Sequence, residues 1–279
     1  MRVAYQGILG AYSEDAVKQY WGASAELLPK PTVEDVFDAV EAAEAEAGLV
    51  PVENTIEGSI TRTSDLLNER NLTILGETIY RVVHCLIVNP GVKFNDVKSV
   101  YSHPQALGQT RVYLDAHGYE AIDYYDTAGA VKMIRDKGLR DSAAVASRRA
   151  AEIYKMGVLE EGIENSKENY TRFLHIGVGS TPPTGSDKTS LAFTIDNRPG
   201  TLVAALQSIA SCSLNLTRIE TRPYPDRPWE YIFFIDFSGH RGDASTRETL
   251  RELTTHTRSL KILGSYPSTF SSKSASRTL

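Results

Sequence analysis

The sequence predicts an α/β domain followed by a smaller α+β domain with ferredoxin-like order. The first observation is that residues 1–178 alternate short apolar runs, typical of strands, with helical patterns. Such alternation builds sheets with helices on both faces. The second is that residues 189–270 show the order strand, helix, strand, strand, helix, strand, which is the ferredoxin-like order. Residues 179–188, rich in Gly, Pro, Ser and Thr, are expected to form the linker.

Capping residues and apolar periodicity place the elements of the first domain. A strand over 2–6 leads through a glycine turn to a helix with Ser13 as N-cap, and Thr32 caps the next helix, over 33–45. A strand that begins at residue 47 is expected to stop at Pro51. The other expected strands cover 81–88, 97–104, 119–125 and 142–147, and the other helices cover 64–70, 106–118, 128–138 and 148–157.

The second domain is expected to hold four strands and two helices. The strands cover 189–195, 214–223, 229–239 and 259–267, and the helices cover 199–212 and 244–256. The tail, residues 271–279, lacks apolar periodicity, so we expect it to be disordered.

Composition and missing motifs exclude several functions. The net charge of −5 argues against nucleic-acid binding, and no run of about 18 apolar residues predicts a membrane span. The sequence lacks a P-loop, a zinc-binding histidine or cysteine pattern and a serine-nucleophile motif. We therefore expect chemistry without metal, nucleotide cofactor or covalent serine. Cys85 and Cys212 lie in apolar surroundings with no signal peptide before them, which indicates reduced thiols in a cytoplasmic protein.

Four polar segments interrupt the apolar pattern of the first 180 residues. They are GILGAYSE, PVENTIEGSI, YSHPQALGQ and NYTRF, and each follows or meets a predicted strand end. Polar side chains beside apolar strands must be hydrogen-bonded, and one such segment is most simply explained by helix caps and turns. Four of them in one domain indicate a shared cleft, because α/β folds place ligands at the ends of strands.

These segments resemble blocks of the monofunctional prephenate dehydratases that carry a C-terminal ACT regulatory domain. PVENTIEGSI, YSHPQALGQ and NYTRF resemble three blocks of the catalytic domain, and PGTLVAAL and LNLTRIETRP resemble two blocks of the ACT domain. The resemblance covers nearly the whole chain in the same order. It departs at Thr201, where the family usually has Ala, and at Thr221, where it usually has Ser.

The resemblance implies a catalytic domain of two α/β lobes, similar to a type II periplasmic binding protein. The lobes would be residues 1–76 with 160–178, and residues 77–159. The implied reaction turns prephenate into phenylpyruvate, CO2 and water. Because the product ring is aromatic, the substrate supplies its own driving force and no cofactor is needed. The implied active-site residues are Thr171, Asn54, Ser102 and Gln109, with Arg172, Phe173 and Thr55 beside them.

The residue types suit this reaction. A Thr hydroxyl has a pKa far above neutrality, so we expect Thr171 to give the departing hydroxide a hydrogen bond that strengthens as charge develops. Asn54, Ser102 and Gln109 are neutral donors that position polar groups without adding charge. Arg172 offers a planar fork for the pyruvyl carboxylate, and an inter-lobe salt bridge is an equal alternative.

Three further positions are candidates at the cleft. Gly10 and Ser13 belong to a turn and helix start that suit an anion, although a plain strand-to-helix turn is the alternative. His103 is either a proton shuttle or a residue that shapes the turn before Pro104. His84, inside an apolar run, is expected to be a hydrogen-bonded core histidine.

The resemblance also implies regulation by L-phenylalanine, bound between ACT modules of two subunits in a dimer or tetramer. Backbone N–H groups at the start of the helix after Pro199 suit the effector carboxylate. Glu220 would bind its ammonium group. The implied effector-binding residues are Gly200, Thr201, Leu202, Val203, Asn215, Leu216, Glu220, Thr221 and Arg222.

Two alternative functions stay open at this stage. An arogenate dehydratase would differ only in an amino group that replaces the pyruvyl keto group of the substrate. A non-catalytic amino-acid sensor would use the same cleft and the same ACT module without chemistry.

Overall fold

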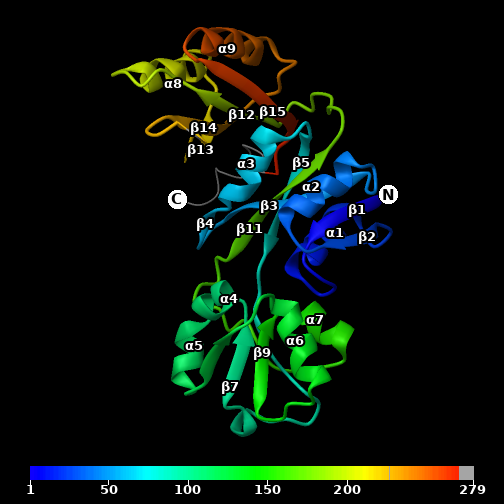
Figure 1. Ribbon diagram of the computed structural model, residues 1–279. Coiled ribbons are helices and arrows are strands. Elements are labelled where there is room, and N and C mark those ends of the chain that lie inside the picture. The colour runs from blue at the N-terminus through cyan, green and yellow to red at the C-terminus, as the bar shows by residue number, and fades with distance from the viewer. Residues whose placement is uncertain (226, 270–279) are drawn as a thin grey trace.

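The computed structural model describes residues 1–225 and 227–269, so the predicted tail lies outside the described residues. Three sheets follow one another along an elongated molecule (Figure 1). The first sheet lies in the middle, the second at one end and the third at the other end. Two segments join the first sheet to the second, so these two sheets form the first and second lobes of a two-lobed α/β domain. The third sheet and its helices, residues 187–267, form a third unit attached to the first lobe.

The first sheet has the strand order β2-β1-β3-β11-β5, with β4 paired to β3. Strand β11 runs antiparallel between β3 and β5, so a late segment of the chain completes the sheet begun at the N-terminus. The strands are β1 (Arg2–Gln6), β2 (Glu26–Lys30), β3 (Ala47–Asn54), β4 (Gly58–Ser59), β5 (Thr73–Arg81) and β11 (Tyr170–Gly177).

The second sheet has the order β10-β6-β9-β7-β8 and carries helices on both faces. Its strands are β6 (Cys85–Val88), β7 (Ser99–Ser102), β8 (Glu120–Asp123), β9 (Ser142–Ala146) and β10 (Gly157–Glu161). A short 3-10 turn, Phe94–Asp96, precedes β7.

The third sheet has the order β13-β14-β12-β15, with both of its helices on one face. This is the βαββαβ order that the sequence predicts. Its elements are β12 (Asp187–Thr194), α8 (Thr201–Ser211), β13 (Leu216–Pro223), β14 (Tyr231–Ser238), α9 (Ala244–Thr255) and β15 (Ser259–Pro267).

Helix ends show which capping predictions hold. Thr32 forms the capping box of α2, in which it accepts from the Asp35 amide and the Asp35 carboxylate accepts in return. Ser13 is not a cap, because the helix α1 already begins at Tyr12. The helices of the two lobes are α1 (Tyr12–Trp21), α2 (Val33–Glu41), α3 (Thr61–Glu69), α4 (Pro104–Gln109), α5 (Arg111–Ala116), α6 (Thr127–Asp136) and α7 (Arg148–Tyr154). The helix predicted over 33–45 is therefore shorter, and the one predicted over 106–118 is broken at Thr110.

Strand β3 does not stop at Pro51, as the sequence predicts, but continues to Asn54. A proline cannot donate to the ladder, so within sheets it is tolerated at irregular positions. The pairing of β3 with β11 shifts here, because Arg172 lies opposite Glu53 while Phe173 lies opposite Pro51. This bulge accommodates Pro51 and lets the strand reach Asn54.

The predicted lobe boundaries also need correction. The strand expected over 81–88 holds only β6, the crossing 82–84 and the last residue of β5, and β5 itself, which ends at Arg81, was not expected. Strand β10 pairs with β6, so the second sheet extends to Glu161. The chain therefore crosses between the lobes within 82–84 and within 162–169, and not after 76 and 159. None of the described helices is long and apolar enough to cross a membrane.

The first and third sheets share a hydrophobic core. Phe234, Leu263 and Tyr266 of the third sheet belong to the same buried cluster as Phe37 and Ile74 of the first lobe. At Gly264 an added Cβ would lie 2.3 Å from the carbonyl oxygen of Ile74, so β15 packs directly on β5 at this point. The third unit is thus packed against the first lobe over an apolar interface.

Candidate active site

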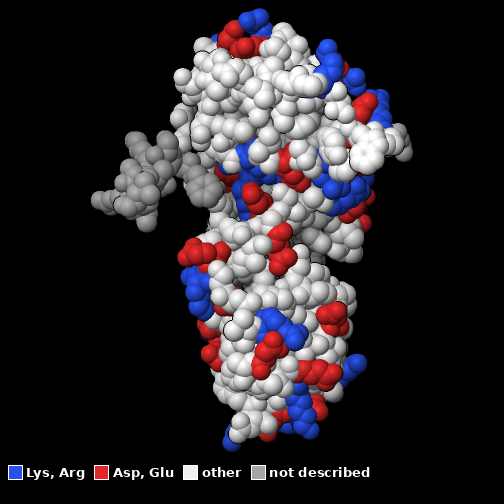
Figure 2. All heavy atoms as spheres, turned by 90° about the vertical axis from the view of Figure 1, so that its left-hand side faces the viewer, with Lys and Arg blue, Asp and Glu red and all other residues white. Residues whose placement is uncertain are grey.

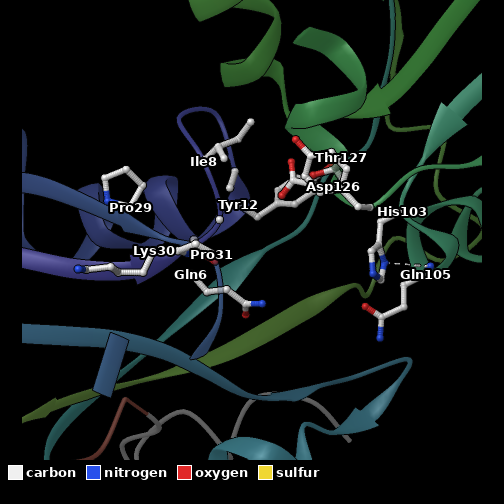
Figure 3. Close-up of a pocket in the computed structure, with 14 residues that line it drawn as sticks. Gln6, Ile8, Tyr12, Pro29, Lys30, Pro31, His103, Gln105, Asp126 and Thr127 are labelled. Atoms are coloured by element: carbon white, nitrogen blue, oxygen red, sulfur yellow. Dashed lines mark hydrogen bonds between the residues drawn. The ribbon is translucent and has the colours of Figure 1, made fainter. Parts of the chain in front are cut away.

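Two adjoining cavities lie between the lobes. The larger, of about 600 Å³, is lined by Gln6 and Tyr12 from the first lobe and by His103 and Thr127 from the second. Figure 3 shows these side chains facing one another across the opening. The smaller, of about 140 Å³, shares Tyr12, His103 and Thr127 with the larger one and leads inward to Thr171.

Asn54 and Thr171 lie opposite each other on β3 and β11 at the floor of the smaller cavity. The side-chain oxygen of Asn54 accepts from the backbone amides of Ile56, at 2.9 Å, and Glu57, at 3.0 Å. The Asn54 amide nitrogen therefore faces the hydroxyl oxygen of Thr171, 3.0 Å away. Because an amide nitrogen only donates, the Thr171 oxygen accepts here and its own hydrogen is left to donate elsewhere.

A buried chain of amides continues from this pair. Asn54 also donates to the Asn169 side-chain oxygen over 2.9 Å, and Asn169 in turn donates to the Gln109 oxygen over 2.8 Å. The ring nitrogen Nε2 of His84 lies 2.8 Å from that same Gln109 oxygen, so it must carry a proton. The other ring nitrogen, Nδ1, is then bare and accepts from the Tyr12 hydroxyl over 2.7 Å. The bonds donated from Asn54 and those donated from Tyr12 thus converge on the Gln109 oxygen, and the chain joins both lobes.

Burial keeps the imidazole of this chain neutral. His84 is 2% exposed, and desolvation lowers its pKa although the bond to Gln109 opposes the shift. The sequence predicts a hydrogen-bonded core histidine at this position, and the structure adds that the ring lines the smaller cavity. Tyr12 and Asn169 were not among the predicted site residues, although both lie within the four polar segments.

Three predicted active-site residues do not line either cavity in the described part of the chain. Ser102 is fully buried and donates to the carbonyl oxygen of Val145 over 2.6 Å. Thr55 donates to the carbonyl of Glu168 and accepts from the amide of Tyr170, so it ties the β3 end to the segment before β11. Phe173 packs in the core of the first lobe. These three residues stabilise the segments that carry the site.

The glycine turn before α1 is also structural at Gly10. Its φ of +92° favours glycine, and an added Cβ would lie 2.9 Å from the Cα of Ala150 in the second lobe. Ser13 does line the larger cavity, from the first turn of α1. His103 caps α4 by accepting from the Gln105 amide at 3.3 Å and lines both cavities, so it shapes the turn from within the cleft.

Arg172 fits neither of its two predicted roles. It is 8% exposed and lines neither described cavity, and its guanidinium points away from the cleft. It contacts Glu53 and Glu77 of the first lobe and Asp236 of the third unit. It is therefore neither a ligand in the cleft nor a bridge between the two lobes.

The predicted effector residues divide into two groups. A cavity of about 250 Å³ in the third unit is lined by Gly200, Thr201, Leu202 and Val203. The remaining ones lie on or beside β13 and do not line this cavity: Asn215, Leu216, Glu220, Thr221 and Arg222.

Two of the β13 side chains that were predicted to bind the effector, Glu220 and Arg222, face the first lobe instead. Glu220 pairs with Arg218 and lies 3.5 Å from the Ser64 hydroxyl, and Arg222 pairs with Asp65. In this conformation, Glu220 is not available to an effector in the described cavity.

Comparison with known proteins agrees with this architecture. The chain matches the family described as prephenate dehydratase over residues 3–181. It is 40% identical over 281 residues to the arogenate dehydratase/prephenate dehydratase 2 of Arabidopsis thaliana. The alignment covers 96% of this chain and 73% of that relative.

Two solved structures are similar along nearly the whole chain. A prephenate dehydratase from Arthrobacter aurescens in complex with L-Phe has a TM-score of 0.89 and 30% identity, and covers 96% of this chain and 90% of its own. GqqA, described as a novel type of quorum quenching acylase, has a TM-score of 0.89 and 33% identity. The superposition covers 96% of this chain and 98% of the GqqA chain.

The fold and the cleft define a two-lobed α/β enzyme whose inner cavity carries a network of neutral hydrogen-bonding side chains, with the Glu57 carboxylate beside them. The family match covers both lobes and the relative covers nearly the whole chain. This chain belongs to the prephenate dehydratase family, and it is an enzyme of the dehydratase class.

Proposed function

We propose that the enzyme converts prephenate into phenylpyruvate, CO2 and water, with the Thr171 hydroxyl as the hydrogen-bond donor to the departing hydroxyl group. The observation that carries the proposal is the amide of Asn54, which donates to the Thr171 oxygen over 3.0 Å. This leaves the Thr171 hydrogen free to donate, and Thr171 lines the cavity where the substrate would lie. A dehydration needs such a donor at the oxygen that leaves.

The residue types explain how the reaction is divided between substrate and protein. Loss of CO2 supplies the electron pair that expels the hydroxide, and the ring becomes aromatic. Thr171 is too weak an acid to protonate the oxygen early, so its hydrogen bond shortens as negative charge grows there, and the proton follows late. The preorganised amide chain behind Thr171 holds this donor in place without rearranging during the reaction.

The substrate carboxylates are assigned to the larger cavity. Helices α1 and α6 both begin at its wall, with Ser13 and Thr127 in their first turns. The first N–H groups of a helix lack partners within the helix and favour anions. At α6 the Asp126 carboxylate already accepts from the Gly129 amide, whereas α1 has no side-chain cap, so the start of α1 is the better anion site of the two. Neutral donors bind the ring carboxylate without fixing its charge, which suits a group that must leave as CO2.

The test is an assay of phenylpyruvate formation from prephenate, read by absorbance in alkali, with the wild-type protein and with Thr171→Ala. The proposal expects turnover by the wild type and a loss of about 10²–10⁴-fold in kcat for the variant. A wild-type protein without turnover would contradict the proposed activity. Equal turnover by both proteins would contradict only the role of Thr171.

An arogenate dehydratase is the second candidate, because the Arabidopsis thaliana relative carries that name with 40% identity. The two substrates differ in a side-chain keto or amino group. Values of kcat/KM on both substrates, measured with one preparation, decide which of them the enzyme prefers.

A sensor and an acylase are weaker candidates. The intact Asn54–Thr171 pair favours chemistry over a sensor without activity. An acylase nucleophile needs an adjacent base, but Thr171 contacts an amide, and burial raises the pKa of the Cys85 thiol to about 12. An assay for acyl-amide hydrolysis by the same preparation tests this second activity.

We also propose that residues 189–270 form an ACT domain that binds L-phenylalanine, that 1–178 form the catalytic domain, and that the protein is a dimer or tetramer. The cavity at the start of α8 and the complex of the Arthrobacter aurescens relative with L-Phe support the effector. Isothermal titration with L-phenylalanine beside an activity assay tests binding and inhibition. Light scattering tests the oligomeric state.

A further inference from the structure

Arg172 sits at the centre of a buried cluster of charges between the first lobe and the third unit. Its Nη1 lies 3.1 Å from Glu77 and its Nη2 lies 2.9 Å from Asp236 of β14. Its Nε lies 3.2 Å from Glu53. Lys188 of β12 contacts Glu77 from the side of the third unit, at 3.0 Å. The side chains of Glu77 and Asp236 are 0% and 4% exposed, so these contacts are shielded from water.

This cluster and the active-site pair occupy neighbouring positions on the same two strands. Thr171 lies opposite Asn54, and the next position pairs Arg172 with Glu53. Successive side chains of a strand point to opposite faces. The two neutral residues therefore face the cleft, while the two charged residues face the third unit.

The ladder is irregular on one side at this place. The register between β11 and β3 shifts directly after Arg172, and a bulge locally disrupts the hydrogen bonds on that side, whereas the pairing with β5 stays regular from Tyr170 to His175. On the β3 side, side-chain anchors therefore contribute to how this short segment is turned. Arg172 is held by three carboxylates, and one of them belongs to the third unit.

The partner in the third unit is itself rigidly held. The other oxygen of Asp236 accepts from the Ser190 hydroxyl over 2.6 Å, and Ser190 is bonded to Tyr266, a fully buried residue of the shared core. A displacement of β14 relative to the first lobe therefore moves Asp236, and Arg172 with it. Breaking one partner of a buried pair leaves the other charge without compensation.

We infer that the third unit positions Thr171 through Arg172, so that the ion pair between Asp236 and Arg172 makes catalysis in the cleft depend on how the third unit is docked. Arg172 is thus a positioning residue and contacts no substrate. The inference rests on the proposed function of Thr171 as the donor to the departing hydroxyl. The inference assigns the coupling between the third unit and the cleft to Arg172, the residue next to Thr171.

The experiment compares Asp236→Asn with Asp65→Asn. The first variant keeps the shape and the acceptor for Ser190 but removes one of the three charges that hold Arg172, the one supplied by the third unit. The second removes a charge from the pair with Arg222, which crosses the same interface at 3.0 Å without reaching Arg172. Both are assayed at a temperature where circular dichroism shows a folded protein.

We expect Asp236→Asn to lower kcat by about ten- to a hundredfold with little change in KM, since a misplacement of about 1 Å costs up to that much. Asp65→Asn is expected to keep kcat within about twofold. Combined with Thr171→Ala, Asp236→Asn is expected to cause no further loss, because it acts through the same group. Equal losses in both single variants, additivity with Thr171→Ala, or a rise in KM alone would overturn the inference.

Hydrogen–deuterium exchange separates this inference from the proposed reaction. Peptides that contain residues 168–176 are expected to exchange faster in Asp236→Asn and to be unchanged in Asp65→Asn. This readout needs no turnover, so an inactive wild-type protein would contradict the proposed function and leave the coupling measurable. Unchanged exchange in Asp236→Asn would contradict the coupling itself.

Discussion

Asn54 donates its amide hydrogen to the Thr171 hydroxyl oxygen across 3.0 Å, and the direction of this bond leaves the Thr171 hydrogen for another partner. The direction begins in the backbone, because two amide groups of the turn after β3 hold the Asn54 oxygen. From Asn54 the donors continue through Asn169 to the Gln109 oxygen, where the bond donated by His84 from the opposite side also ends. One turn of backbone therefore orients the Asn54 amide, which donates to both Asn169 and Thr171.

Asn54→Asp reverses the polarity at Thr171 while it preserves the shape. The aspartate still accepts from the turn, but its second oxygen accepts from Thr171 and draws the hydrogen away from the cavity. We expect kcat to fall by about 10²-fold, the effect of losing one preorganised donor, with little change in KM. Since a protonated aspartate can donate again, the ratio of variant to wild-type kcat should rise as the pH is lowered. A ratio that is constant with pH would contradict the assigned direction.

Thr171 is expected to be the most sensitive position of the cleft. Thr171→Ala and the isosteric Thr171→Val should lower kcat by about 10²–10⁴-fold with little change in KM, because the hydroxyl matters mainly in the transition state. Thr171→Ser should keep much of the activity, since it keeps the donor. Steady-state kinetics of the three variants check this. If valine supports near wild-type kcat, the hydroxyl is not the donor.

Much of the fold could be predicted because local signals decide it. Thr32 and Asp35 form the capping box within four residues, and the βαββαβ order follows from periodicity and turns. The sequence did not predict β5 or the crossing between two sheets that follows it at 82–84, since apolar side chains carry no information on which sheet buries them. Strand β10 was missed because its last two residues are glutamates, which are depleted in strands.

The site was predictable where several polar segments end at one sheet edge. Asn54, Gln109 and Thr171 do meet at the smaller cavity. The role of Arg172 could not be predicted, because Glu77 and Asp236 lie 95 and 64 positions away in the sequence and are brought together only by the packing of the third unit. The charge composition does not indicate this buried cluster of charges. On the surface, Figure 2 shows positive and negative side chains interspersed over the face that it draws.

Stability is expected to depend on pH through His175. Its ring lies in β11 against Trp21, and burial lowers its pKa to about 4, from an ordinary value of 6.5. The unfolded chain takes up the proton first as the pH falls, so this contribution is complete above pH 6.5 and is lost between 6.5 and 4. At pH 5 the loss is about 1–2 kcal/mol.

Urea unfolding at pH 7 and pH 5 measures this loss, with His175→Gln as the neutral comparison. The variant should lose less stability than the wild type between the two pH values, whatever its stability at pH 7. An equal loss in both proteins would assign the pH dependence to other groups, among which His84 also has a lowered pKa.

The last prediction concerns Thr201 at the cavity of the third unit. Its hydroxyl donates to the carbonyl oxygens of Asp196, at 2.8 Å, and Arg198, at 2.9 Å, so it ties down the loop that lines the cavity and has no hydrogen left to donate to an effector. Thr201→Ala should loosen this loop and weaken L-phenylalanine binding by about fivefold, the equivalent of one hydrogen bond of about 1 kcal/mol. Thr254→Ala is the matched control, because its hydroxyl bonds a helix carbonyl away from the cavity. Isothermal titration of both variants decides the matter, and tighter binding by Thr201→Ala would mean that the extra methyl and hydroxyl crowd the effector.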